Sequence, residues 1–217
     1  MKNRWFFWSI FVVSLLLGLW VYFTTPNVPV PVHLNMRGEV DGYGSKFMGT
    51  LLFPLVILVV GLLLIYLEKI DPFRENVKRS RKAIDATLDI VAAFMLFFQI
   101  AFAWLIKTNS NKLDTAVLYV GMGIMFILIG NYLPTIKRNF FVGVRTPWTL
   151  ASDSVWRSTH RLAGWAFVLL GLWTILVGIL KLNFWLWFVV FIVVVIYISI
   201  VYPFVKFKKE QSENKLS

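Results

Sequence analysis

The chain contains six apolar runs, each long enough to cross a lipid bilayer as a helix. A helix needs about 20 apolar residues to span the ~30 Å hydrocarbon core. Five of the runs carry no charged residue and the third carries one, Asp89. Of the 217 residues, 59% are apolar, which is more apolar side chain than one soluble domain can bury. We therefore predict an all-α, polytopic membrane protein with six transmembrane helices, over residues 5–24, 47–67, 87–106, 115–133, 162–180 and 184–205.

The distribution of Lys and Arg predicts how these helices are oriented. Cytoplasmic loops of membrane proteins carry an excess of these residues. The N-terminus, residues 68–86, residues 134–161 and the tail after 205 hold 17 of the 22 Lys and Arg. We therefore predict that both termini are cytoplasmic. The net charge of +11 then reflects loop orientation, and no direct contact with nucleic acid is expected.

The predicted spans divide the chain into four regions. Residues 1–67 form a two-helix unit with an extracellular loop at 25–46, and residues 68–86 form a basic cytoplasmic loop. Residues 87–205 form a four-helix unit with a cytoplasmic segment at 134–161, and residues 206–217 form a basic tail. The first run could instead be a signal peptide. We expect an uncleaved helix, because 20 apolar residues are long for a signal and no small-residue cleavage site follows.

The extracellular loop is expected to be ordered. Prolines alternate with valines over residues 28–32, which is typical of a short extended strand, and residues 35–38 and 41–44 are typical of turns. The imidazole of His33 and the carboxylates of Glu39 and Asp41 could bind zinc. Their spacing matches no standard motif, so a network of turns without a metal is favoured. This loop is the best candidate for recognising something outside the cell, through His33, Asn35, Glu39, Asp41 and Tyr43.

A short helix is predicted to lead into the fifth span. Ser152 can cap its start, and Asp153 and Arg157 would form an ion pair four residues apart. Trp156 would stack on His160 at the same spacing. Serine, aspartate and histidine also suggest a hydrolase, but Asp153 and His160 lie about 10.5 Å apart along a helix. No nucleophile-elbow motif is present and the chain has no cysteine, so neither an enzyme nor a cofactor is expected.

Two polar side chains, Asp89 and Gln99, lie within the third span. An ionisable group inside a membrane segment is a functional hypothesis by default. Asp89 is close to the predicted inner boundary of the membrane, however. A structural ion pair with Arg81, Lys82 or a basic residue before the fifth span is therefore as well supported as a functional role. If both polar groups lined one path, the chain would be a small transporter or channel. Six helices with so few polar groups make a poor conduit.

Three glycines in the fifth span, Gly164, Gly171 and Gly178, recur every seven residues. This spacing puts them on one helix face, where a neighbouring backbone can approach closely. We predict that this face packs against another helix.

Four segments around the fourth and fifth spans form a pattern: Asn-Tyr-Leu-Pro at 131–134, Lys-Arg-Asn-Phe-Phe-Val-Gly-Val-Arg-Thr-Pro-Trp-Thr-Leu at 137–150, Val-Trp at 155–156 and Thr-His-Arg at 159–161. This pattern closely resembles the signature of the SdpI family of bacterial immunity proteins. Residues 31–35 and 38–46 resemble the small uncharacterised domain that often precedes it. The resemblance reaches from the first span to the sixth. Its candidate inner site comprises Asn131, Arg138, Asn139, Arg145, Thr146, Pro147, Trp148, Trp156, His160 and Arg161.

This resemblance implies a protein of the bacterial cytoplasmic membrane that protects the cell from a secreted antimicrobial peptide toxin. It also implies a receptor that, with toxin bound, holds a winged-helix transcriptional repressor at the membrane. A secreted toxin arrives from outside or within the bilayer, and a repressor is cytoplasmic. The loop at 25–46 is therefore expected to face the toxin and the segment at 134–161 the repressor. The alternative for the inner segment is a structural clamp against lipid headgroups.

Overall fold

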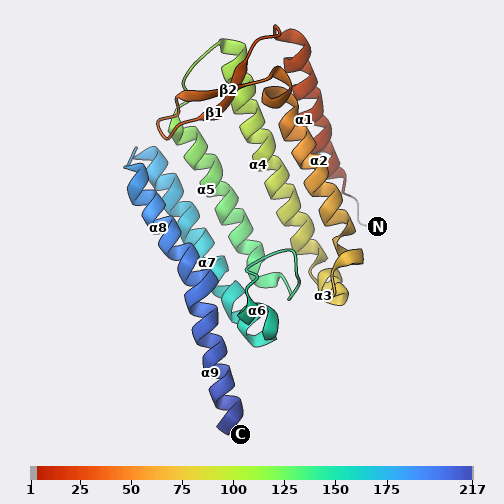
Figure 1. Cartoon of the computed structure of the whole chain (residues 1–217), viewed down its shortest axis with the longest axis vertical. Helices are drawn as coiled ribbons and strands as arrows, with labels where there is room; N and C mark the ends of the chain where they lie inside the picture. The colour runs from red at the N-terminus through yellow and green to blue at the C-terminus, as the bar shows by residue number, and fades with distance from the viewer. Residues whose placement is uncertain (1–3, 217) are drawn as a thin grey trace.

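The computed structural model describes residues 4–216, which form a bundle of long helices with a β-hairpin across one end (Figure 1). Six helices are long and apolar enough to cross a membrane, which confirms the predicted number. The long helices are α1 (Trp5–Thr24), α2 (Lys46–Ile70), α4 (Arg81–Thr108), α5 (Thr115–Tyr132), α7 (Asp153–Ile179), and α8 (Phe184–Ile196), which continues through a π-turn (Tyr197–Val201) into α9 (Tyr202–Leu216). The short elements are β1 (Val30–Leu34), β2 (Val40–Gly44), α3 (Arg74–Arg79), a 3-10 turn (Leu133–Thr135) and α6 (Pro147–Ala151).

The starts of several helices are fixed by polar side chains that accept backbone N–H groups. Ser45 caps α2, Asp114 caps α5 and Asn183 caps α8, each through its side-chain oxygen. Ser152 caps α7 by accepting from the N–H groups of Ser154 and Val155, as predicted. The short helix expected before the fifth span is continuous with it, so α7 begins nine residues before the predicted apolar run.

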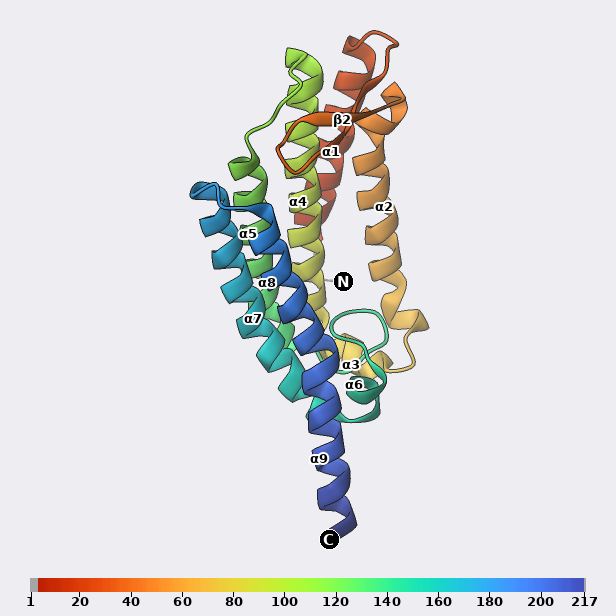
Figure 2. The ribbon, with the colours of Figure 1, turned by 60° about the vertical axis from the view of Figure 1, so that its left-hand side comes forward.

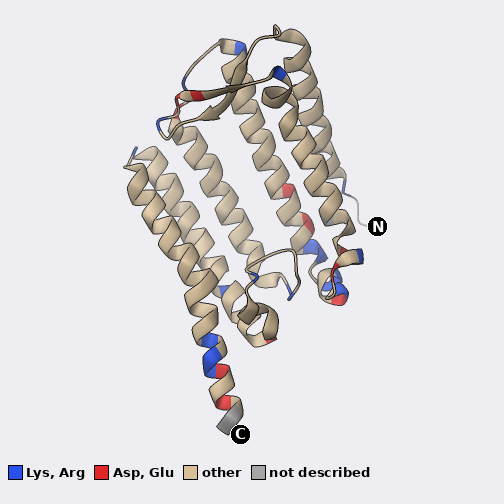
Figure 3. Cartoon of the chain, viewed as in Figure 1, with Lys and Arg blue, Asp and Glu red and all other residues tan. Residues whose placement is uncertain are grey.

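The helices pack in two groups. On one side α1, α2 and α4 contact one another; on the other, α5 lies along α7, and α8 covers part of α7 (Figure 2). The predicted division placed α4 with the second unit, but α4 contacts α1 and α2 as well as α5. Charged residues gather at the end of the bundle near α3 and along α9, with few at the hairpin end (Figure 3). This distribution agrees with the predicted orientation, which stays a prediction.

The contact between α5 and α7 depends on glycines. A Cβ at Gly123 would lie 2.5 Å from the carbonyl oxygen of Gly171, and one at Gly130 would lie 2.7 Å from that of Gly164. A Cβ at Gly178 would meet the Tyr119 side chain at 2.4 Å. Such distances are shorter than carbon contacts allow, so only glycine permits this approach. The predicted packing face is confirmed.

The loop between α1 and α2 is an antiparallel hairpin of β1 and β2. The proline–valine segment forms β1, as predicted. Gly38 adopts φ +75° at the turn, which agrees with the turn expected there. The second expected turn, at residues 41–44, is wrong: these residues are in β2. The glycines there serve close packing, because a Cβ at Gly42 would lie 2.8 Å from the Cβ of His33.

Candidate functional site

The hairpin presents three of its five predicted recognition residues to the surroundings. His33, Asp41 and Tyr43 are exposed, and His33 Nδ1 lies 2.6 Å from Asp41 Oδ1 across the two strands. Asn35 and Glu39 are half-buried and shape the turn instead. The Asn35 side-chain oxygen accepts from the N–H groups of Arg37 and Glu39, and its amide donates to the Glu39 carboxylate. The exposed part of the predicted recognition surface is therefore His33, Asp41 and Tyr43.

The hairpin is held against the loop between α4 and α5. The Val40 N–H donates to the Asn111 carbonyl, and the Leu113 N–H donates to the Gly38 carbonyl, each at 2.8 Å. Lys112 lies 3.6 Å from the Glu39 carboxylate. The Asn35 amide, and with it Lys112, lowers the pKa of the Glu39 carboxyl below its ordinary value. These contacts fix the hairpin over the ends of the helices.

The possible zinc set in the hairpin does not come together. His33 contacts Asp41, but Glu39 is turned away toward Asn35 and Lys112. Over residues 4–216, no group of three His, Cys, Asp or Glu side chains is placed to hold a metal ion. The pairing of His33 with Asp41 is a cross-strand contact of the kind that stabilises a hairpin.

At the opposite end of the bundle, the signature segment (residues 134–161) is organised around buried Asn139. The Asn139 amide donates to the carbonyls of Lys137 and Val142, and its side-chain oxygen accepts from the N–H groups of Phe141 and Val142. One side chain thus makes four hydrogen bonds within a six-residue loop. Asn139 therefore shapes the loop and is not available to a partner.

The loop is also fixed by residues that no sequence motif indicated. Asp71, buried after α2, accepts the N–H groups of Phe73 at 2.7 Å and Phe140 at 2.9 Å through its two carboxylate oxygens. The Ser80 hydroxyl accepts from the Lys137 N–H, and the Asn76 amide donates to the Arg138 carbonyl. The region at 68–86, predicted only as a basic loop, therefore holds the signature segment in place.

Trp156 and His160 lie behind the loop, fully buried and stacked with ring centroids 4.0 Å apart, as predicted. The Trp156 indole donates to the Ile136 carbonyl at 2.7 Å. His160 Nδ1 lies 2.9 Å from the Trp156 carbonyl, and His160 Nε2 accepts from the Val144 N–H at 3.1 Å. Both ring nitrogens are used by the backbone, so His160 supports the loop and is not placed as a catalytic base.

The predicted ion pair between Asp153 and Arg157 is wrong. Asp153 pairs with Arg138, whose Nε lies 3.0 Å from its carboxylate, because the loop brings Arg138 to the start of α7. Arg138 also donates to the Leu150 carbonyl and lies over the Phe73 ring. Arg157 is exposed on the outer face of the helix.

The remaining residues of the candidate inner site divide between structural and exposed positions. Thr146 forms a capping box with Thr149 at the start of α6, where Pro147 occupies the first turn. Trp148 packs edge-on against Phe204 of α9, with ring centroids 5.3 Å apart. The exposed members are Asn131, whose amide donates within α5 to the Ile127 carbonyl, and Arg145, Pro147 and Arg161.

The C-terminal helix contacts the signature segment as well. The Ser152 hydroxyl donates to both carboxylate oxygens of Glu210 at 2.9 Å, and the Ser154 hydroxyl also contacts this carboxylate. Figure 1 shows α9 leaving the bundle beside α6. The predicted basic tail is therefore a helix whose acidic residue binds at the start of α7.

Gln99 and Asp89 lie in different surroundings. Gln99 is buried and joins three helices, because its amide donates to the carbonyls of Ser14 and Thr50 and its oxygen accepts from the Ser14 hydroxyl. Asp89 borders an apolar groove between α4 and α5. The two residues therefore do not line one polar path, which removes the basis for the transporter alternative.

The bundle and its two ordered polar ends define a multi-pass membrane protein. Residues 135–205 match the SdpI/YfhL protein family, and residues 9–58 match a domain of unknown function, DUF1648. The chain therefore combines a C-terminal SdpI/YfhL family region with an N-terminal DUF1648 region. This family is not a family of enzymes, in agreement with the expectation from the sequence.

Among curated proteins, the chain is similar to the Immunity protein SdpI of Bacillus subtilis (strain 168). The two are 36% identical over 55 residues, which cover 25% of this chain and 27% of the relative. The match thus spans about a quarter of the relative's length. No solved structure matches the chain.

Proposed function

We propose that this chain is a membrane immunity protein that protects the cell producing it from a secreted peptide toxin. The observation that supports this most directly is the match to the SdpI/YfhL family, with the similarity to an immunity protein. The fold is consistent with it, because the protein places an ordered hairpin at one end of a membrane-spanning bundle. The predicted orientation puts this end outside the cell, where a secreted peptide arrives.

The exposed residues of the hairpin form the first contact surface in this proposal. Tyr43 is 59% exposed and lies on the same hairpin as His33 and Asp41. An exposed aromatic beside polar groups is typical of residues that dominate protein contacts. The hairpin's anchoring by the loop between α4 and α5 means that little ordering entropy is lost on binding.

Survival of toxin-sensitive bacteria that express the full chain tests this proposal. We expect expression to raise the toxin concentration needed for killing, and Tyr43→Ala with His33→Ala to reduce that protection. Leu182→Ala, at the same end of the bundle but outside the hairpin, is the matched control. Membrane accumulation of each variant is measured by immunoblotting. No protection by the unaltered chain would refute the proposed function.

We further propose that the signature segment passes a signal to a cytoplasmic repressor. Phe140 and Phe141 are each 42% exposed, and Arg145 beside them donates to the Phe140 carbonyl at 2.7 Å. This aromatic and cationic surface is supported from behind by Asn139 and His160. This signalling role is tested by the fluorescence of a labelled repressor at the membrane. Arg145→Ala is expected to abolish the recruitment of the repressor to the membrane and to leave survival under toxin unchanged. Equal loss of survival would place the segment in the immunity mechanism.

A further inference from the structure

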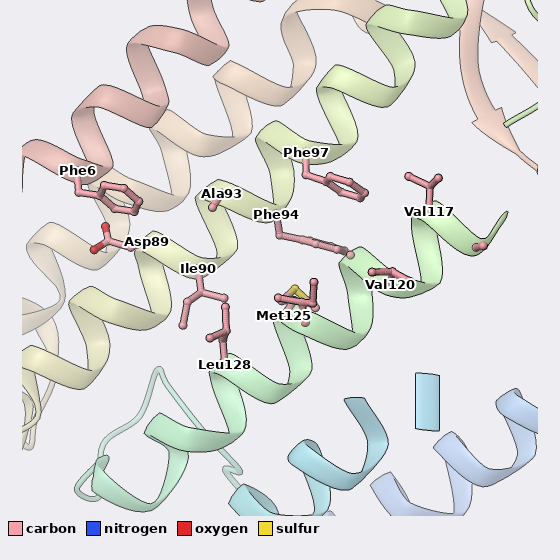
Figure 4. A pocket seen from close by; sticks show the side chains of 13 residues that line it. Phe6, Asp89, Ile90, Ala93, Phe94, Phe97, Val117, Val120, Met125 and Leu128 are labelled. Atoms are coloured by element: carbon pink, nitrogen blue, oxygen red, sulfur yellow. The ribbon is translucent and has the colours of Figure 1, made fainter. Parts of the chain in front are cut away.

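The face of α5 that does not contact α7 borders an apolar groove. The groove has a volume of about 660 Å³ and lies between α4 and α5, with Phe6 of α1 near one end (Figure 4). Close packing of α5 on α7 through glycines holds α5 in position there, and its contact with α4 is much less extensive. Its walls include Ile90, Phe94 and Phe97 from α4 and Val117, Ile124 and Leu128 from α5.

The spacing of the lining residues fits another helix. On α4 they are four and three residues apart, and on α5 they are seven and four apart. These intervals form ridges along each helix, and such ridges accept the side chains of a third helix. From Ala116 to Leu128 the groove extends about 18 Å along the α5 axis. This exceeds the ~15 Å depth of one leaflet's hydrocarbon, so the groove continues past the bilayer midplane and can contact about 12 residues of a membrane-spanning helix.

Asp89 supplies a negative charge at the end of the groove near Phe6 (Figure 4). Within residues 4–216, no hydrogen bond or ion pair joins Asp89 to another residue, although Arg4 and Lys82 lie with it around a smaller cavity at this end. The guanidinium groups nearby are engaged elsewhere: Arg4 and Arg81 both pair with Asp85 at 3.1 Å. The pairing expected between Asp89 and Arg81 is therefore not formed. An acidic group at the end of an apolar groove is complementary to an apolar segment that carries one cation.

We propose that the groove between α4 and α5 binds an apolar, membrane-spanning peptide helix whose amine or lysine pairs with Asp89. The identity of this peptide as the toxin rests on the proposed function; the binding itself does not. In this arrangement the hairpin makes the first contact and the groove holds the peptide inside the bilayer. A peptide held there is no longer free in the surrounding bilayer.

Photo-crosslinking in vesicles of phosphatidylcholine tests the binding directly. The probe is a synthetic helix of 18 leucines and alanines with one terminal lysine and a central diazirine, and the matched peptide has glutamine in place of lysine. We expect the lysine peptide to label residues of α4 and α5 in the full chain. Asp89→Asn should reduce its labelling roughly tenfold, the loss of one charge pair in an apolar setting, and leave the glutamine peptide unchanged.

Filling the groove provides the second test. Ala93→Phe adds bulk inside the groove, and Val193→Phe adds the same ring to the exposed face of α8 as the control. Only Ala93→Phe should reduce labelling. Equal labelling by both peptides, labelling outside α4 and α5, displacement by phosphatidylethanolamine alone, or occupation of the groove by a second copy of the chain would each overturn the inference.

Survival of cells that carry the same variants separates this inference from the proposed function. If the unaltered chain protects and Ala93→Phe protects equally well, the groove is not the toxin site although the immunity function stands. If the unaltered chain gives no protection but the lysine peptide still labels the groove, the immunity function fails and peptide binding stands.

Discussion

Replacing Asp71 by alanine is expected to release the signature segment without unfolding the membrane bundle. Asp71 is 4% exposed and accepts two backbone N–H groups, one from its own loop and one from Phe140. A hydrogen bond to a charged acceptor contributes about 1.5–3 kcal/mol. Losing both is therefore expected to cost at least about 3 kcal/mol, which corresponds to a roughly hundredfold increase in opening of the loop.

Limited trypsin digestion of the purified protein measures this opening, because the loop contains Lys137, Arg138 and Arg145 as cleavage sites. Cleavage rate follows the open population when the loop opens and closes faster than it is cut. Asp71→Asn keeps one carbonyl acceptor and should give about a tenfold increase. Glu75→Gln removes a charge from the same region, where Glu75 pairs with exposed Lys78, and is the control.

Three outcomes of the digestion distinguish the explanations. A graded increase from Asp71→Asn to Asp71→Ala, with Glu75→Gln unchanged, supports the two hydrogen bonds as the cause. An equal increase in all three variants would indicate a general effect of charge on the basic loop. No increase in Asp71→Ala would refute the argument, since the loop would then be held without this carboxylate.

Three further predictions concern the bundle itself. With cysteines introduced singly by Tyr43→Cys and Ser212→Cys, a membrane-impermeant maleimide should label position 43 but not 212 in intact cells, and the reverse pattern would contradict the predicted orientation. Gln99→Leu should lower the free energy of unfolding by about 1–2 kcal/mol in denaturant titrations, because the hydrogen bonds that join three helices are lost. Gly171→Ala should lower the thermal midpoint markedly, whereas Leu172→Ala on the exposed face should change it little; equal effects would argue against close packing at Gly171.

The sequence predicted the helices well, because membrane spans are determined by long stretches without charge. It also predicted the stack of Trp156 on His160 and the glycine face of α7, since both follow from the helical repeat. The strand β1 could be predicted from alternation, but Gly42 suggested a turn where it allows the strands to approach. Local patterns were therefore reliable where the cause was local.

The roles of the inner residues depended on partners far away in the chain. Asn139 is polar and lies in a loop, so the sequence suggested that it belongs to a contact surface. In the structure its side chain is buried and forms hydrogen bonds within the loop. Asp71 precedes a proline, which is a turn signal, but nothing in its neighbourhood points to Phe140, which is 69 residues later. The ion pair of Asp153 changed partner for the same reason, because Arg138 reaches it only after the loop has folded.

The contact of Glu210 with Ser152 and Ser154 has a consequence for the end of the chain. Removing residues 206–217 would delete more than a solvated tail, since the carboxylate at the start of α7 would be lost with it. Negative charge there is favourable to the helix dipole. A reporter protein fused after α9 would keep this contact, whereas one that replaces α9 would not. Topology measured with the second kind of fusion would thus describe a protein whose signature segment lacks one of its natural supports.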